Sequence, residues 1–394
     1  MVSRAALIAL LLLVPQVAAA ETVQERLAAA VAAHDYRALQ EAAAELGREP
    51  GYASAASAAS DFSALALAGA PAERACVAGA ERPDALVYLV ELSRLLERSL
   101  RFPEVATCLV AASALEPTPE RRQQAARALL RAGRDAEASK LLEADGDTEL
   151  LAEVDGLAGR QVAQSGRWSE LRWVVAGAGA EAFAAEVASA YGAYVEATGH
   201  RLAQGLLVER LDGAVRARTR LGGLPSEGVA GVTLGPLVSV TSGLPVALER
   251  EVIWHELAHA FLAVRAPYGG SAWLGEAAAF AWSRSLLSAA EFESVAWPTG
   301  SGWSGWLDDL ERSDDSILEG AARMARDGFA AEVGCWFAGR FGMAALLEVY
   351  GATAQGEAVA AAFARVSGVS DADLRAAFEA ERAGLSRPMG RRGP

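Results

Sequence analysis

One hydrophobic period dominates the first half of this chain of 394 residues. From residue 22 to about residue 180, apolar residues recur at intervals of three and four, and β-branched runs are almost absent. This spacing places the apolar side chains on one face of successive turns, so it predicts helices throughout the region. Glycine and proline interrupt the pattern, for example at residues 69–71 and 117–119, which predicts short helices joined by short turns.

An offset of 33 residues relates five positions at which one predicted helix has ended and the next begins. These positions are Tyr36, Gly69, Phe102, Asp135 and Trp168. The offset, and the helix pair predicted over residues 125–142, resemble the helical pairs of tetratricopeptide repeats. Stacked repeats of this kind would hold a protein partner on their concave face. An irregular helical bundle is the alternative, because alanine-rich helices readily produce chance periodicity.

The first 20 residues have a different sequence pattern from the rest of the chain. Arg4 is followed by an apolar run over residues 5–14 and by three alanines at residues 18–20. This order is typical of a cleaved secretory signal, so we expect an extracytoplasmic protein, periplasmic or secreted. An uncleaved signal would instead anchor the chain to the membrane. The run is shorter than the roughly 20 residues that a spanning helix needs, so no stable membrane span is expected after cleavage.

Cysteine spacing and net charge limit the remaining possibilities. Cys76, Cys108 and Cys335 lack the C-x-x-C spacing of zinc ribbons and redox sites. A Cys76–Cys108 disulfide and three buried reduced cysteines are both compatible with the sequence. The net charge of −14 argues against a nucleic-acid partner, because such binding depends on neutralising phosphates.

Beyond about residue 185 the pattern becomes mixed. A helix to residue 197 is followed by β-like runs at residues 206–211, 214–221, 229–234 and 237–241. Asp212-Gly213 between the first two runs predicts a hairpin. We therefore expect a small, mainly antiparallel sheet, with an edge strand within residues 229–240 that can hold an extended substrate by strand addition.

Helical periodicity returns after Pro245, and the helix contains His255-Glu256-Leu257-Ala258-His259. Residues four apart lie one turn above another on the same helix face, so both imidazoles can bind one metal ion. Glu256 then lies at the edge of the ion without binding it. This placement suits a general base that takes a proton from an attacking water.

A second helix is expected after the break at residues 267–270, with Ser271 as its cap and Glu276 in its second turn. A catalytic zinc ion requires a third protein ligand and a fourth position for water. A carboxylate on an adjacent antiparallel helix meets that requirement. Glu276 is the candidate.

Together, the motif at residues 255–259 and Trp273-Leu274-Gly275-Glu276 resemble the gluzincin class of zinc metallopeptidases, specifically the bacterial peptidase MA-like family. Those proteins typically read HELAHA and then W-L-x-E-G-x-A, whereas this chain has Ala277 at the glycine position. The resemblance covers about residues 185–381, and only the zinc motifs are specific. It implies Zn2+ bound by His255, His259 and Glu276, with Glu256 as the catalytic base and a protein or peptide as substrate.

The chain departs from the family pattern at two further places. Phe280 occupies the position at which thermolysin-like enzymes carry a carboxylate that orients a ligand histidine. Residues 327–329, Asp-Gly-Phe, correspond to a stretch that carries an oxyanion-stabilising tyrosine in many relatives. The candidates for that role stay open and are Tyr268, Tyr350, His200 and Arg265.

The sequence therefore predicts a mainly α protein with a small α+β part. We expect a signal peptide over residues 1–20, a tetratricopeptide-like helical-repeat domain over 21–182, a zincin-like metallopeptidase domain over 183–385 and a disordered tail over 386–394. The predicted function is zinc-dependent peptide hydrolysis. The alternative is an extracytoplasmic helical-repeat scaffold with an inactive or structural zinc domain, and a third possibility is a zinc hydrolase acting on another amide, such as cell-wall peptide.

Overall fold

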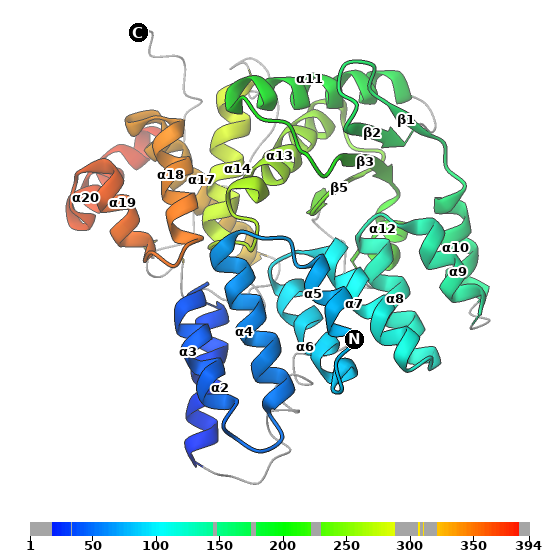
Figure 1. Cartoon of the computed structure of the whole chain (residues 1–394). Coiled ribbons are helices and arrows are strands. Elements are labelled where there is room, and N and C mark those ends of the chain that lie inside the picture. Colours follow the sequence, from blue (N-terminus) through cyan, green and yellow to red (C-terminus); the bar gives the residue numbers. More distant parts are fainter. Residues whose placement is uncertain are drawn as a thin grey trace. The chain divides into compact units, whose positions relative to one another are not determined.

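The computed structural model describes residues 18–32, 34–144, 148–174, 179–221, 230–287, 306–307, 310 and 321–385 (Figure 1). These residues form 17 helices and one five-stranded sheet, so the prediction of a mainly helical chain with a small sheet is confirmed. The chain divides into two compact units. The first comprises residues 1–162, 211–227 and 234–237, and the second comprises residues 163–210, 228–233 and 238–394.

The first unit is built from short helices, most of which pack on helices one or two places away along the chain (Figure 1). Such packing is expected where turns of a few residues join amphipathic helices. The helices are α2 (Ala18–Ala32), α3 (Tyr36–Leu46), α4 (Ala53–Ala68), α5 (Glu73–Gly79), α6 (Ala85–Arg98), α7 (Phe102–Leu115), α8 (Pro119–Arg131), α9 (Asp135–Glu143), α10 (Thr148–Ala158) and α12 (Gly213–Thr219).

The 33-residue offset marks helix starts at three of its five positions. Tyr36, Phe102 and Asp135 are the first residues of α3, α7 and α9. Gly69 instead ends α4 in the left-handed conformation, with φ of 60°, and Trp168 lies in the segment before a strand. The assignment to tetratricopeptide-like repeats stays a prediction.

Two long-range connections tie the helices of the first unit together. Cys76 of α5 and Cys108 of α7 form a disulfide across 32 residues of sequence. The guanidinium of Arg220, directly after α12, is fully buried and donates to both carboxylate oxygens of Asp135, at 2.5 and 3.0 Å. Since an unpaired charge is costly to bury, this pairing fixes α12 against the start of α9.

The second unit combines the sheet with longer helices. Its helices are α11 (Ala180–Thr198), α13 (Val246–Arg265), α14 (Ala272–Leu286), α17 (Ala321–Phe341), α18 (Met343–Thr353), α19 (Val359–Ser367) and α20 (Asp371–Leu385). The sheet contains β1 (Val162–Gln164), β2 (Leu171–Val174), β3 (Leu206–Leu211), β4 (Gly231–Leu234) and β5 (Leu237–Thr241) in the order β1-β2-β3-β5-β4. Strand β4 therefore forms one edge.

The sheet differs from the prediction in two respects. Residues 214–221 do not form the second strand of a hairpin, because Asp212 caps a helix: its carboxylate accepts hydrogen bonds from the amides of Ala214 and Val215 at the start of α12. Strands β1 and β2 lie in a region that was expected to be wholly helical. Strand β2 pairs with β3 in parallel, so the sheet is mixed rather than mainly antiparallel. Only the Gly235-Pro236 turn joins β4 to β5, which requires an antiparallel pair there.

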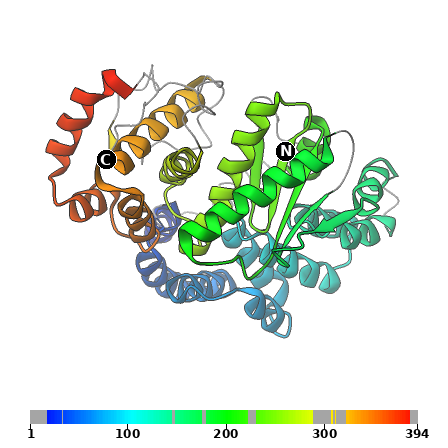
Figure 2. The same cartoon turned by 90° about the horizontal axis from the view of Figure 1, so that it is seen from above.

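A single apolar core holds the helices of the second unit on the sheet. Helix α11 lies beside α13 (Figures 1 and 2), and α14 packs against both α13 and α17. The buried hydroxyl of Tyr194 on α11 donates to the main-chain carbonyl of Trp254 on α13 at 2.7 Å. This bond fixes α13 immediately before the first histidine of the motif.

Several sequence predictions lie outside the described residues. They are most of the signal peptide (residues 1–17) and the tail over residues 386–394. Among the described residues, no helix combines the length and apolar character that a membrane crossing requires.

Candidate metal centre

Helix α13 presents the two predicted histidine ligands on one face. Its bounds, Val246–Arg265, agree with the predicted start after Pro245 and the predicted end before residues 267–270. The Nε2 atoms of His255 and His259 lie 3.1 Å apart. This convergence follows from the i, i+4 spacing on a regular helix.

Helix α14 brings the third predicted ligand to the same point. It begins at Ala272, and Glu276 lies in its second turn. The Glu276 carboxylate oxygens lie 3.2 Å from His255 Nε2 and 3.5 Å from His259 Nε2. One ligand atom from each of the three side chains lies within 4.8 Å of the others. Two imidazoles and a carboxylate are a donor set that suits zinc, with a fourth position left for water.

Close helix packing determines where Glu276 lies. Gly334 of α17 faces the main chain of Ala277, and a Cβ atom built at residue 334 would overlap the Ala277 carbonyl. Helices α14 and α17 therefore approach backbone to backbone at the residue after the predicted ligand. Small residues at this crossing allow the close approach.

The charges at the centre stabilise each other. Burial lowers the pKa of His259, but the carboxylates of Glu276, Glu256 and Asp327 outweigh burial and raise it to about 9. Burial raises the pKa of Glu276, yet the two imidazoles hold it well below its ordinary value. Without a metal, the ionised Glu276 carboxylate therefore favours the protonated form of His259.

Glu256 lies beside the three converging groups and is held by the edge strand. The Thr233 hydroxyl on β4 lies 2.8 Å from Glu256 Oε2 and 2.8 Å from the Glu256 main-chain oxygen. At Gly231, also on β4, a Cβ atom would lie only 2.8 Å from Glu256 Oε1. The sequence placed an edge strand in this region but singled out neither Thr233 nor Gly231, because no local pattern shows which strand residue meets the helix.

The position of Phe280 has a visible structural consequence. Its ring packs against the His255 imidazole, with centroids 4.3 Å apart. His255 Nδ1 is buried and has no hydrogen-bond partner within the described part of the chain. A histidine that binds a metal usually donates its other ring N–H to an acceptor, which orients the ring. Here the packing of Phe280 orients the His255 imidazole instead.

The four open candidates for an oxyanion donor differ in their surroundings. His200 and Arg265 are exposed, and Tyr268 is buried. Tyr350 of α18 is buried next to α14, and a Cβ atom on Gly275 would lie 3.7 Å from its ring. Burial, together with the charge of Glu276, raises the pKa of Tyr350 to about 12, so its hydroxyl keeps its proton at neutral pH.

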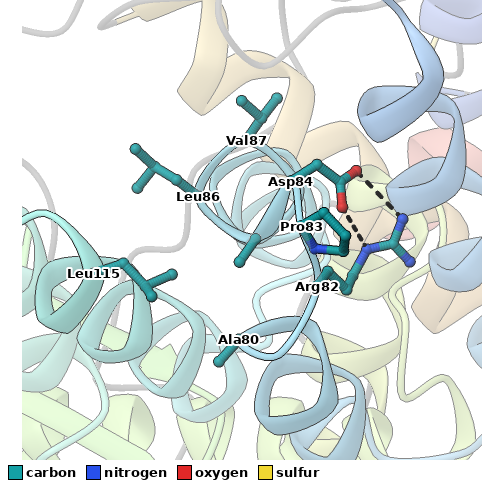
Figure 3. Close-up of a pocket in the computed structure, with 8 residues that line it drawn as sticks. Ala80, Arg82, Pro83, Asp84, Leu86, Val87 and Leu115 are labelled. Carbon is teal, nitrogen blue, oxygen red and sulfur yellow. Dashed lines mark hydrogen bonds and ion pairs between the residues drawn. The ribbon is translucent and has the colours of Figure 1, made fainter.

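The first unit contains a different kind of surface feature. A pocket of about 350 Å3 lies between α6 and the ends of α5 and α7 (Figure 3). Arg82 and Asp84 form a two-point ion pair at its side, at 3.0 and 3.3 Å. The Val87 and Leu115 side chains at the pocket are 53% and 47% exposed, so apolar surface faces the solvent there.

Comparison of the chain with protein-family models, with curated proteins and with solved structures finds no significant match.

Proposed function

We propose that this protein is a zinc-dependent peptidase of the gluzincin type, related to the bacterial peptidase MA-like family. The observation that carries the proposal is the convergence of His255, His259 and Glu276, with the Glu256 carboxylate beside them. Sequence spacing alone brings together two of these three side chains, His255 and His259. The third requires a second helix in the correct position, and α14 supplies it.

Each side chain has a role in this proposal. His255, His259 and Glu276 would hold the metal, and zinc bound there would supply a Lewis acid that makes water available as a nucleophile near neutral pH. Glu256 takes a proton from the water as its oxygen attacks the carbonyl carbon, and passes the proton to the leaving amine when the C–N bond breaks. The reaction is hydrolysis of a peptide bond.

The sheet edge supports a peptide as the substrate. Strand β4 is at the edge of the sheet, and Thr233 on this strand contacts Glu256. An extended chain paired with β4 would bond through its main chain, which gives affinity with tolerance of sequence. A protein or peptide paired there passes close to the general base.

The disulfide supports the predicted extracytoplasmic location. Cys76 and Cys108 are joined in the structure. Disulfides of this kind persist in oxidising compartments and are rare in the cytosol of most organisms. We therefore propose that the chain acts in the periplasm or outside the cell, after removal of residues 1–20.

Replacement of the general base tests the proposal. Glu256→Gln is expected to keep stoichiometric zinc and to lose at least ~100-fold in turnover of a fluorescently labelled denatured casein. Glu249→Gln on the same helix is the matched control, since Glu249 pairs with Arg210 at 3.3 Å and does not contact the centre. Wild-type turnover in Glu256→Gln would refute the mechanism.

A second candidate function rests on the first unit. Exposed Val87 and Leu115 beside the pocket offer apolar surface to a protein partner, as a helical-repeat scaffold requires. In that case the metal centre would be structural or inactive. Bound zinc without chelator-sensitive casein cleavage would favour the scaffold, whereas cleavage only of cell-wall peptide would favour a hydrolase acting on another amide.

A further inference from the structure

Strand β4 contacts the general base through two residues on one face of the strand. Residues two apart in a strand point to the same side, and both Gly231 and Thr233 lie against Glu256. Thr233 provides a hydroxyl and Gly231 provides space. The two oxygens of the Glu256 carboxylate therefore have different surroundings.

Thr233 binds one of these oxygens. Its Oγ1 lies 2.8 Å from Glu256 Oε2 and 2.8 Å from the Glu256 main-chain oxygen, and Glu256 is only 8% exposed. The Thr233 hydroxyl has one proton to donate. The two oxygens near it, the main-chain oxygen and the carboxylate oxygen of Glu256, are both acceptors. A hydrogen bond to an ionised carboxylate is stronger than one between neutral groups, so the contact restricts rotation of the side chain.

Gly231 leaves room for the other oxygen. A Cβ atom at this position would lie 2.6 Å from a Val252 methyl carbon, 2.7 Å from Glu256 Cγ and 2.8 Å from Glu256 Oε1. Carbon atoms do not approach this closely without displacement. A side chain at residue 231 would therefore require the Val252 and Glu256 side chains, or strand β4 itself, to shift.

We infer that Thr233 is a positioning residue for the general base: it holds Glu256 Oε2 and leaves Oε1 for proton transfer. This inference rests on the proposed peptidase function. Because Thr233 lies on the edge strand, the strand that would bind an extended peptide also sets the carboxylate that acts on it. Substrate alignment and base alignment then depend on a single element.

Isosteric replacement separates positioning from packing. Thr233→Val removes the hydroxyl and keeps the volume, whereas Thr233→Ser keeps the hydroxyl. With labelled casein, we expect Thr233→Val to lower kcat about 10-fold and to leave KM and zinc affinity within about 2-fold, because an aligned base acts in the transition state. Thr233→Ser should recover kcat to within about 3-fold of wild type.

Controls separate this effect from a general loss of a buried hydroxyl. Thr219→Val is the matched control, because Thr219 is buried and donates to the Val215 carbonyl at 2.8 Å in the other unit. It should leave kcat unchanged. Gly231→Ala should lower kcat at least as far as Thr233→Val and keep its zinc.

Three results would overturn the inference: wild-type kcat in Thr233→Val, a loss that serine does not restore, or wild-type kcat in Gly231→Ala. Crystal structures of the wild type and Thr233→Val provide a readout that needs no activity. The Glu256 carboxylate should leave its wild-type position in the variant, and an unmoved carboxylate would also refute the inference. Failure of wild-type protein to cleave casein would count against the proposed function, while the crystal structures would still decide the role of Thr233.

Discussion

In the proposed zinc site, a proton and the metal would compete for the same three side chains, and this competition can be measured. In the metal-free protein, Glu276, Glu256 and Asp327 raise the pKa of His259 to about 9 against the opposing effect of burial. Glu276 contributes the largest part of this rise. The perturbation that tests it is Glu276→Gln, which removes the charge and nearly keeps the shape.

The free energy of this interaction follows from the difference between the His259 pKa of about 9 and the ordinary histidine pKa of 6.5. Since one pKa unit corresponds to about 1.4 kcal/mol, the difference is equivalent to roughly 3 kcal/mol. The pKa of His259 is raised in the folded state. Its contribution to the stability of the metal-free protein is therefore fully present below pH 6.5 and is lost as the pH rises through 9. Zinc must displace the proton, so zinc affinity at pH 7 should be ~100-fold below its value at high pH.

Proton NMR of the imidazole C–H resonances provides the assay. The chain has four histidines, so the spectrum is simple, and His34 and His200 outside the centre serve as internal references. In metal-free wild type we expect one resonance to titrate near pH 9, and in Glu276→Gln its midpoint should fall toward or below 6.5. A wild-type midpoint near 6.5, or a midpoint that the substitution does not move, would refute the reasoning.

Further predictions concern metal retention and stability. Phe280→Asp should give His255 Nδ1 an acceptor and tighten zinc binding by about 10-fold in chelator competition, whereas Phe280→Leu should not; equal affinities in the two variants would contradict this. Gly334→Ala should displace α14 and weaken zinc binding by at least ~10-fold, while Gly339→Ala, whose added Cβ would meet nothing within 4 Å, should retain wild-type affinity. Replacement of both Cys76 and Cys108 by serine should lower the free energy of unfolding of the helical unit by ~4 kcal/mol in denaturant titrations, because the disulfide closes a loop with a 32-residue separation. A change below ~1 kcal/mol would contradict this loop-closure argument.

The sequence predicted those parts of the structure that local geometry determines. The approach of His255 to His259 follows from the pitch of a helix, so five residues were enough to place both imidazoles. Glu276 required more, namely a helix break and a return, and the glycines and proline at residues 267–270 supplied that signal. In contrast, Asp212-Gly213 supports either a hairpin or a helix cap, and only the bonds to the amides of α12 distinguish them.

The residues that sequence patterns do not identify are those whose roles depend on contacts with distant parts of the chain. Gly231 and Gly334 provide space, against Glu256 in one case and against the backbone of α14 in the other. A glycine in a helix or strand is locally unfavourable, and nothing in its neighbours along the chain shows which distant atom approaches it. Thr233 is likewise an ordinary strand residue until Glu256 is folded against it. The proposed metal ligands are therefore readable from the sequence, whereas the alignment of the proposed general base depends on tertiary contacts of the edge strand.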